Sequence, residues 1–403
     1  MISTKSERGV GYSVAELNDV RHMFVSAVPR SGESLEEQAH DALRTVNEVI
    51  PQHGRCGSIV HQAVFLKDLT QVETCRKIIK DFYGDRLPAT SYIPQPPCEG
   101  KHLAIEALGV GCGHGEVQIE RCCEQMVVTE HSGVRWVHAA NLLPSPASSG
   151  VYSRSLVAFQ RMADMLAKRN VKYDHVIRTW LYLGAITGPE GDTQRYKELN
   201  RARTDFYEPI KFGMDRLPPG LKHAIYPAST GIGTDGDGIV MSCIALETTR
   251  SDLMLVPLEN PQQVSAFDYG THYSPRSPKF ARAMAVTAGD AATVFVSGTA
   301  SITDSESRYD GDPGAQTDLT LDNIEKLIAP ENFRRHGVPH FGATLEDLAL
   351  VRVYIKRQED YETIRAVCER RFGERPTIYA VADVCRPELL VEIEAMAWSH
   401  RRD

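Results

Sequence analysis

One pattern of apolar segments occurs three times along this chain of 403 residues. Each copy opens with a short apolar strand, at 23–26, 136–139 and 294–297. A segment with apolar residues at helical spacing follows, at 35–49, 155–168 and 319–328. A β-rich segment then leads into a second helix, at 61–66 and 73–82, 177–183 and 196–207, and 350–355 and 361–372. Each copy ends with a Pro-small pair and an apolar strand, at 103–108, 239–247 and 389–397. A repeat on this scale indicates three copies of one structural unit.

The order strand, helix, strand, helix, strand predicts an α/β fold of the α+β kind, with a mixed sheet and helices on one of its faces. We expect three tandem units, at 1–115, 116–256 and 257–403, with linkers near 109–113 and 257–277. The third copy has an additional segment at 303–316, rich in Asp, Ser and Gly, which predicts a loop.

Composition narrows the class of partner. Hydrophobic residues make up 42% of the chain and charged residues 24%, as in ordinary globular proteins. A net charge of −8 argues against a nucleic-acid-binding protein, which usually has a basic face. It is compatible with a small anionic substrate, because a few arginines in a cleft set the local field.

The chain predicts a cytoplasmic protein. The first residues contain no apolar segment typical of a signal peptide. No run approaches the roughly 18 apolar residues that a membrane helix needs. Nine cysteines without a regular spacing indicate a reducing compartment.

Two motifs that suggest a cofactor do not fit their usual context. Cysteines and a histidine cluster at 98–123, but the cluster lacks the paired CxxC spacing of zinc sites. Residues 231–236 form a GxGxxG that leads into a strand rather than into a helix, so we expect a β-hairpin turn there. We expect neither a metal nor an organic cofactor.

The end of the third copy resembles the signature of the RidA (YjgF-like) family, in PTIYAV at 376–381 and LLVEIEAMA at 389–397. All three copies resemble it loosely. The family's imine deaminases hold the substrate carboxylate with an arginine two residues after the proline. This chain has Thr90, Ser229 and Ile378 at those positions, and none of them can form a bidentate pair with a carboxylate.

From about residue 120 onward the chain resembles the chorismatases, which consist of fused RidA-like units. The matching stretches are RTW at 178–180, Arg203, PASTGIG at 227–233, ENP at 259–261, YSPR at 273–276, FAR at 280–282, SGTA at 297–300 and ENFRRHG at 331–337. The resemblance implies a lyase or hydrolase that releases pyruvate from chorismate. The first 115 residues are expected to be additional to that layout.

The resemblance assigns the proton donor to Glu392. Protonating the methylene carbon of an enolpyruvyl ether requires an acid that keeps its proton near neutral pH, and an apolar strand raises the pKa of a carboxyl. Glu392 and Glu394 point to the same face of their strand, because side chains alternate. Without the resemblance, a position on the solvated face of an edge strand is the alternative.

The two carboxylates of chorismate require cationic partners, for which arginine forks are well suited. The candidates for substrate binding are Arg203, Arg276 and Arg282, with Tyr269 and Tyr273 as hydroxyl donors or ring walls. For any one of these arginines taken without the resemblance, a surface position is the ordinary alternative.

Two positions bear on the product. Chorismatases that release the dihydro-diol have a slightly larger residue in place of Gly298 and no thiol in place of Cys385. This chain resembles the kind that forms 3-hydroxybenzoate at both positions, so Cys385 is a second catalytic candidate and Gly298 a substrate-binding one. The alternatives are a small buried filler for Cys385 and strand packing for Gly298.

The main hypothesis is therefore a chorismatase that forms 3-hydroxybenzoate, or a dihydro-dihydroxybenzoate, and pyruvate. Some positions depart from the family pattern, among them Leu181, Ala202 and Asp304, so a related enolpyruvyl or cyclohexadiene acid remains open as substrate. A non-enzymatic protein that binds small carboxylates is the second hypothesis, and imine deamination is the third. Three units in one chain can close a ring internally as a pseudo-trimeric monomer, with a homotrimer as the alternative.

Overall fold

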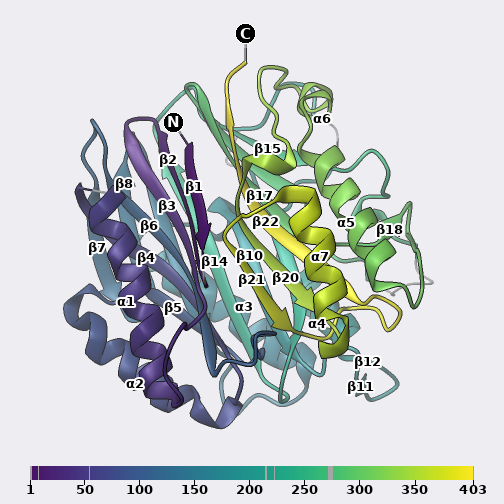
Figure 1. Cartoon of the computed structure of the whole chain (residues 1–403). Coiled ribbons are helices and arrows are strands. Elements are labelled where there is room, and N and C mark those ends of the chain that lie inside the picture. Colours follow the sequence, from purple (N-terminus) through teal and green to yellow (C-terminus); the bar gives the residue numbers. More distant parts are fainter. Residues whose placement is uncertain are drawn as a thin grey trace.

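The structure, a computed structural model, describes residues 2–7, 9–53, 55–213, 216–221, 223–270 and 276–402. In these ranges, three six-stranded sheets follow one another along the chain. Long helices cover the outer face of each sheet, as Figure 1 shows for the two sheets at its left and right. We propose that each sheet with its helices is one unit, and we name the three units first, second and third in chain order.

The elements repeat from unit to unit. The first unit contains β1 (Ile2–Glu7), β2 (Val10–Leu17), β3 (Val20–Ala27), α1 (Leu35–His53), β4 (Arg55–Leu66), α2 (Val72–Tyr83), β5 (Ala89–Ile93) and β6 (Leu103–Cys112). The second contains β7 (Gln118–Cys123), β8 (Met126–His131), β9 (Val134–Leu142), α3 (Val151–Ala167), β10 (Val176–Gly184), the short pair β11 (Pro189–Glu190) and β12 (Thr193–Gln194), α4 (Arg195–Tyr207), β13 (Ala228–Thr234) and β14 (Ile239–Thr248). The third contains β15 (Met254–Leu258), β16 (Ala283–Ala288), β17 (Ala291–Ala300), the short pair β18 (Ile302–Thr303) and β19 (Glu306–Ser307), α5 (Pro313–Ile328), α6 (Pro330–Arg335), β20 (Leu348–Ile355), α7 (Tyr361–Phe372), β21 (Thr377–Val381) and β22 (Val391–His400).

The three sheets share one topology. In the third, the order is β15-β16-β17-β22-β20-β21, so the closing strand β22 lies inside the sheet between β17 and β20. All neighbours are antiparallel except the last pair, β20 and β21, which is parallel. The mixed sheet with helices on one face, predicted from the repeat, is confirmed.

Apolar spacing explains the helices. In α1, Leu35, Ala39, Leu43, Val46 and Ile50 recur every three or four residues and are all buried against the sheet. Helix α5 begins after Asp312, whose carboxylate accepts a hydrogen bond from the backbone N–H of Ala315, with Pro313 in the first turn.

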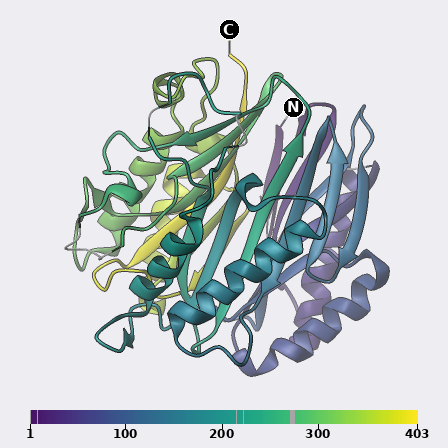
Figure 2. The ribbon, with the colours of Figure 1, turned by 180° about the vertical axis from the view of Figure 1, so that it is seen from behind.

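Each sheet is buried on both faces. The outer faces pack against their own helices and form three separate cores. The inner faces of all three sheets meet in one central core, to which the first unit contributes Phe65, the second Trp180 and the third Tyr354. Figure 2, seen from behind, shows the helices of the second unit on the outside, as expected for sheets that enclose a common centre.

Four local expectations were wrong. The predicted linker at 109–113 lies mostly inside β6, because Gly109 lets the strand pass close beneath α1, with the Cδ1 atom of Ile50 3.0 Å from where a Cβ would lie. Pro257 belongs to β15, so the predicted boundary at 256/257 cuts through a strand. The additional segment at 303–316 forms the β18–β19 hairpin and the first turn of α5 rather than only a loop. Residues 231–236 do not form a hairpin turn, because β10 lies between β13 and β14.

Candidate active site

A cavity of about 470 Å³ opens between the second and third units. Helix α4 and strand β13 form one side of it. Strands β17 and β22, with the segments before β16 and before β22, form the other. The lining residues are Thr187, Gln194, Tyr196, Lys197, Asn200, Arg203, Ser229, Gly231, Tyr269, Pro278, Phe280, Arg282, Gly298, Ala300, Ile302, Cys385, Arg386, Pro387, Glu388, Leu389 and Glu392.

Glu392 reaches this cavity from the middle of β22. Its residue is only 5% exposed, and its carboxyl makes no hydrogen bond to any residue that the structure describes. Burial raises the pKa of Glu392 to about 8, and the negative charge of Glu394 adds to that effect, while Arg178 and Arg282 oppose it. The carboxyl therefore keeps its proton at neutral pH.

Glu394, two residues further along the same strand, has the opposite environment. Its Oε1 accepts hydrogen bonds from Trp180 Nε1 at 2.9 Å and lies 3.0 Å from Arg352 Nη1. Its Oε2 accepts from Arg178 Nη2 at 2.6 Å and from the hydroxyl of Thr230. Burial alone would raise the pKa of Glu394, but Arg352 and Arg178 outweigh it and hold that pKa below its usual range. Two carboxyls on one strand face thus have different protonation states, a pattern typical of acid catalysis.

Arg203 and Arg282 lie in the wall of the cavity. Arg203 on α4 donates to Ser229 Oγ at 3.3 Å and to Asn200 Oδ1, and its Nε is buried without a partner among the described atoms. Arg282 donates from Nη2 to Tyr269 Oη at 2.6 Å and to the Val264 carbonyl at 3.1 Å. Both guanidinium groups lie 5.5 Å from the ring centre of Phe280, within the range of a cation–π contact.

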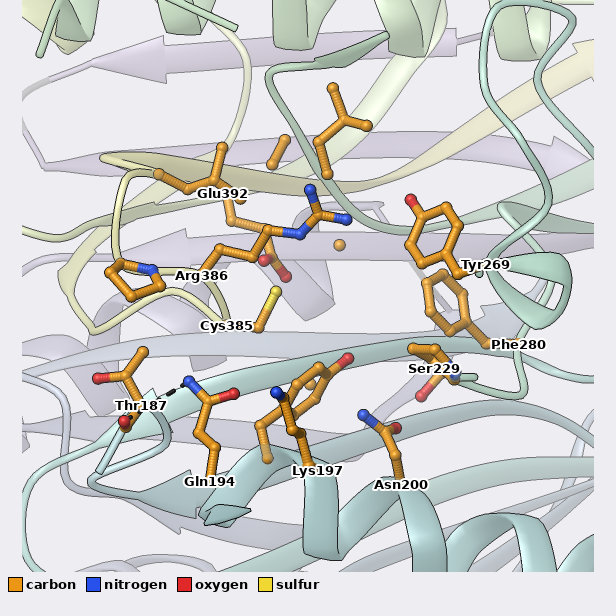
Figure 3. Close-up of a pocket in the computed structure, with 18 of the residues that line it drawn as sticks. Thr187, Gln194, Lys197, Asn200, Ser229, Tyr269, Phe280, Cys385, Arg386 and Glu392 are labelled. Carbon is orange, nitrogen blue, oxygen red and sulfur yellow. Dashed lines mark hydrogen bonds between the residues drawn. The ribbon is translucent and has the colours of Figure 1, made fainter. Parts of the chain in front are cut away.

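The side chain of Cys385 points toward the carboxyl of Glu392 (Figure 3). Burial raises the pKa of its thiol to about 12, and the nearby Glu392 contributes to that shift. The group is therefore a neutral thiol at physiological pH, able to donate a weak hydrogen bond. Gly298 on β17 lies beside the carboxyl of Glu392, and its backbone N–H donates to Thr230 Oγ1 at 3.0 Å.

The structure therefore brings six of the eight predicted site residues to one cavity: Glu392, Cys385, Arg203, Tyr269, Arg282 and Gly298. Arg276 is not among the lining residues. Its side chain is 58% exposed and lies 3.9 Å from Asp205 on the surface, so its predicted role in the cavity is wrong for this structure. Tyr273 lies outside the described residues.

Several polar lining residues were missed, among them Lys197, Asn200 and Arg386. Lys197 and Asn200 project from α4 toward the wall formed by Cys385 and Glu392 (Figure 3). Tyr196, Asn200 and Arg203 are four and three residues apart on one helix face, a signal that the sequence did contain. Arg386 follows Cys385 and donates to the Ser305 carbonyl at 2.9 Å, so the β18–β19 hairpin holds it in place.

The described residues contain no group of three His, Cys, Asp or Glu side chains arranged to hold a metal ion. They also contain no helix that is both long and apolar enough to cross a membrane.

A related but altered arrangement lies between the first and second units. There, Ser91 Oγ accepts from the backbone N–H of Asn141 at 3.1 Å, as Thr230 accepts from Gly298. Ser91 also bonds Ser242 Oγ at 2.7 Å, where Thr230 bonds Glu394. Strand β14 thus has a serine in place of the ionised carboxyl of β22.

Comparisons with known proteins agree with this geometry. Residues 113–245 match the family model described as "Chorismatase FkbO/Hyg5-like, N-terminal", and residues 277–399 match "Endoribonuclease L-PSP". A 3-hydroxybenzoate synthase of Streptomyces hygroscopicus is 35% identical over 230 residues, which are 56% of this chain and 64% of that protein. The chain thus spans slightly less than two thirds of this relative. A chorismatase of Streptomyces rapamycinicus is 32% identical over 274 residues, covering 66% of this chain and 77% of the relative.

A crystal structure of a chorismatase has the same fold, with a TM-score of 0.64 at 23% identity over 84% of this chain and 93% of that one. Residues 116–403 are a smaller share of the chain than 84%, so the likeness extends into the first unit. The sequence had suggested that the first unit is additional to the chorismatase layout. The extent of the match shows that at least part of this unit belongs to that layout. With both the sequence match and the fold in agreement, this chain belongs to the chorismatase family.

Proposed function

We propose that the protein converts chorismate to 3-hydroxybenzoate and pyruvate. One observation carries the proposal: the buried carboxyl of Glu392, which makes no hydrogen bond to a described residue, opens on a cavity lined by Arg203 and Arg282. The family relationship supports it, because two relatives from Streptomyces are named 3-hydroxybenzoate synthase and chorismatase.

The cavity suits a small dianion. Four cationic side chains line it, those of Lys197, Arg203, Arg282 and Arg386, against the carboxyls of Glu388 and Glu392. Because Glu392 is neutral at pH 7, the field inside is positive. The guanidinium groups of Arg203 and Arg282 each lie 5.5 Å from the Phe280 ring centre, so two cations are available, one for each carboxylate of the substrate.

The carboxylic acid supplies the proton that the reaction needs. Glu392 transfers it to the methylene carbon of the enolpyruvyl ether, which leaves an oxocarbenium-like centre on the ether carbon. The neighbouring ring hydroxyl attacks the ring carbon that carries the ether, the carbon–oxygen bond to the pyruvyl group breaks, and pyruvate leaves. The hydroxyl loses its proton as the epoxide closes, and a proton returns to that oxygen as the epoxide opens. The ring then loses a proton to form the aromatic product, and that proton restores Glu392. The atoms of 3-hydroxybenzoate and pyruvate together are those of chorismate, so the reaction consumes no water.

We propose 3-hydroxybenzoate as the product because of the residues at positions 298 and 385, Gly298 and Cys385. The missing side chain at position 298 leaves room for the Glu392 carboxyl itself, because Oε1 of Glu392 lies only 2.0 Å from where a Cβ would be, and this placement of the acid would set how the substrate is protonated. The neutral thiol of Cys385 faces the same space and would steer the opening of the epoxide.

The test is product analysis of the purified protein incubated with chorismate. We expect equimolar pyruvate, measured by coupling to lactate dehydrogenase, and 3-hydroxybenzoate, measured by chromatography. Glu392→Gln should bind chorismate but release no pyruvate. Glu130→Gln removes an exposed carboxyl that pairs with Arg135 and should leave the rate unchanged. Tight binding of chorismate by the unaltered protein without any pyruvate would instead identify a binding protein.

We also propose that the chain acts as a pseudo-trimeric monomer in the cytoplasm. The inner faces of its three sheets already fill one common core, which supports a ring closed within one chain. The eight cysteines that the structure describes are all free, which suits a reducing compartment. Light scattering coupled to size-exclusion chromatography distinguishes a monomer from a homotrimer.

A further inference from the structure

An ion cluster lies directly behind the candidate acid, in the central core. It consists of Arg178 on β10, Arg352 on β20, Glu394 on β22 and Glu106 on β6, all at most 4% exposed. Arg352 binds Glu106 with two parallel hydrogen bonds, from Nε and Nη2, each 2.5 Å long. Its Nη1 lies 3.0 Å from Glu394 Oε1, and Arg178 Nη2 is 2.6 Å from Glu394 Oε2. The cluster thus joins all three units in one chain of contacts.

The cluster balances its charges without Glu392. Arginine stays protonated in proteins, so Arg178 and Arg352 contribute two positive charges. Burial raises the pKa of Glu106, and Arg352 opposes that shift. Both carboxyl oxygens of Glu106 accept hydrogen bonds from Arg352, a bidentate geometry that fits a carboxylate. Glu106 and Glu394 therefore contribute two negative charges. A third carboxylate at Glu392 would have no cation of its own in this interior, and an unpaired buried charge is costly.

Lys197, Arg203, Arg282 and Arg386 line the same cavity as Glu392, but no cation among the described residues is hydrogen-bonded to its carboxyl. Tyr196 on α4 and Cys385 in the segment before β22 are neutral, and burial raises the pKa of both. Arg282 is charged but bonds Tyr269 and the Val264 carbonyl. Arg178 is charged but bonds Glu394 and Thr230.

We propose that Glu394 is a positioning residue for Glu392, and that Arg352 and Glu106 extend this device into the first unit. Resting on the proposed acid role of Glu392, the inference assigns a function to the first unit. Glu394 contacts Arg178 through Nη2 and Arg352 through Nη1 and so directs these two charges away from Glu392, while Nη1 of Arg178 is buried without a partner among the described atoms. Glu106 occupies Arg352 from the other side.

Two substitutions test this device. Glu394→Gln keeps the shape of the side chain and leaves the cluster with one excess positive charge, so Glu392 should lose its proton at lower pH. We expect the upper limb of the pH–rate profile for pyruvate release to move down by at least one pH unit, which is about tenfold lower activity on that limb. Glu106→Gln, more than 280 residues away in sequence, should move it in the same direction by less. Glu130→Gln, an exposed carboxyl on β8, is the matched control and should not move it.

A readout that does not depend on turnover separates this inference from the proposed activity. The infrared carbonyl band of protonated Glu392, identified by difference against Glu392→Gln, reports its titration directly. If Glu394→Gln fails to fold, Glu106→Gln carries the test, because Arg352 then keeps Glu394 as a partner. A band that disappears at the same pH in the unaltered protein and in both variants would overturn the positioning role. A band that moves as expected in a protein that releases no pyruvate would retain the positioning role and reject the chorismatase proposal.

Discussion

A Cβ atom placed on Gly298 would lie 2.0 Å from Oε1 of Glu392 and 2.9 Å from its Cδ. No real Cβ comes that close to another heavy atom, so any side chain at position 298 must displace the carboxyl. Thr230 Cγ2, at 3.1 Å, blocks movement on a second side. The position of the candidate acid therefore depends on the absence of a side chain on the neighbouring strand.

Gly298→Ala should move the carboxyl of Glu392 and change the reaction. We expect pyruvate release at least tenfold slower, with a larger share of dihydro-diol among the products because the displaced carboxyl takes up part of the space of the ring. Chromatography of the products measures both. Gly238→Ala is the control, since no atom lies within 4 Å of the added Cβ. An unchanged rate and product ratio in Gly298→Ala would contradict the geometry.

Arg203→Met should weaken substrate binding more than turnover. A hydrogen bond to a charged group contributes about 1.5–3 kcal/mol, which corresponds to roughly a tenfold or greater rise in KM. The neighbouring Arg201 is the matched control, because its side chain is 47% exposed and pairs with Glu198 at 2.7 Å. Arg201→Met should leave KM within twofold. Equal effects of the two substitutions on KM would remove Arg203 from the binding site.

The titration of Glu392 predicts how stability depends on pH. The fold holds the proton up to a pKa of about 8, whereas the unfolded chain releases it near 4.5. Between these values the unfolded state binds fewer protons, so the free energy of unfolding falls as pH rises, by on the order of 4 kcal/mol in total. Glu392→Gln cannot titrate and should lose this slope. Urea denaturation at pH 5 and pH 9 should show the variant gaining stability relative to the unaltered protein only at the higher pH.

Buried histidines predict a loss of stability in acid. Burial lowers the pKa of His22 and His138 to about 3 and that of His131 to about 4. The unfolded chain takes up these protons near pH 6.5, so stability is complete above that pH and is lost as pH falls toward 4. His138→Gln should reduce the fall of the urea midpoint between pH 7 and pH 5. The same substitution at the exposed His400 should not, and identical slopes in all three proteins would exclude this cause.

Sequence reasoning located elements whose burial is periodic. The helices were predicted to within a few residues of α1, α2, α4 and α7 because each has an apolar face. The first strands of each unit, such as β7 with its alternating exposure, were missed. The short parallel strands after each Pro-small pair were missed as well. Those parallel strands have five to seven residues, too few for periodicity to identify.

Only part of the candidate site could be predicted from the sequence, for a different reason. Glu392, Arg203 and Arg282 could be named from the family resemblance. The contact between Arg352 and Glu106 joins residues 246 positions apart, and no local pattern marks it. Arg276 was misplaced because a charged residue in a matching motif does not reveal which way its side chain points.

The serine on β14, Ser242, which bonds Ser91, has a broader consequence. In an assembly of identical subunits, one codon change alters every interface at once. The cleft at one interface therefore cannot acquire a catalytic residue while the cleft at another keeps a residue that only packs. Here each interface is encoded separately. Ser242 and Glu394 show that the two corresponding sites have diverged independently, one toward simple hydroxyl packing and the other toward chemistry.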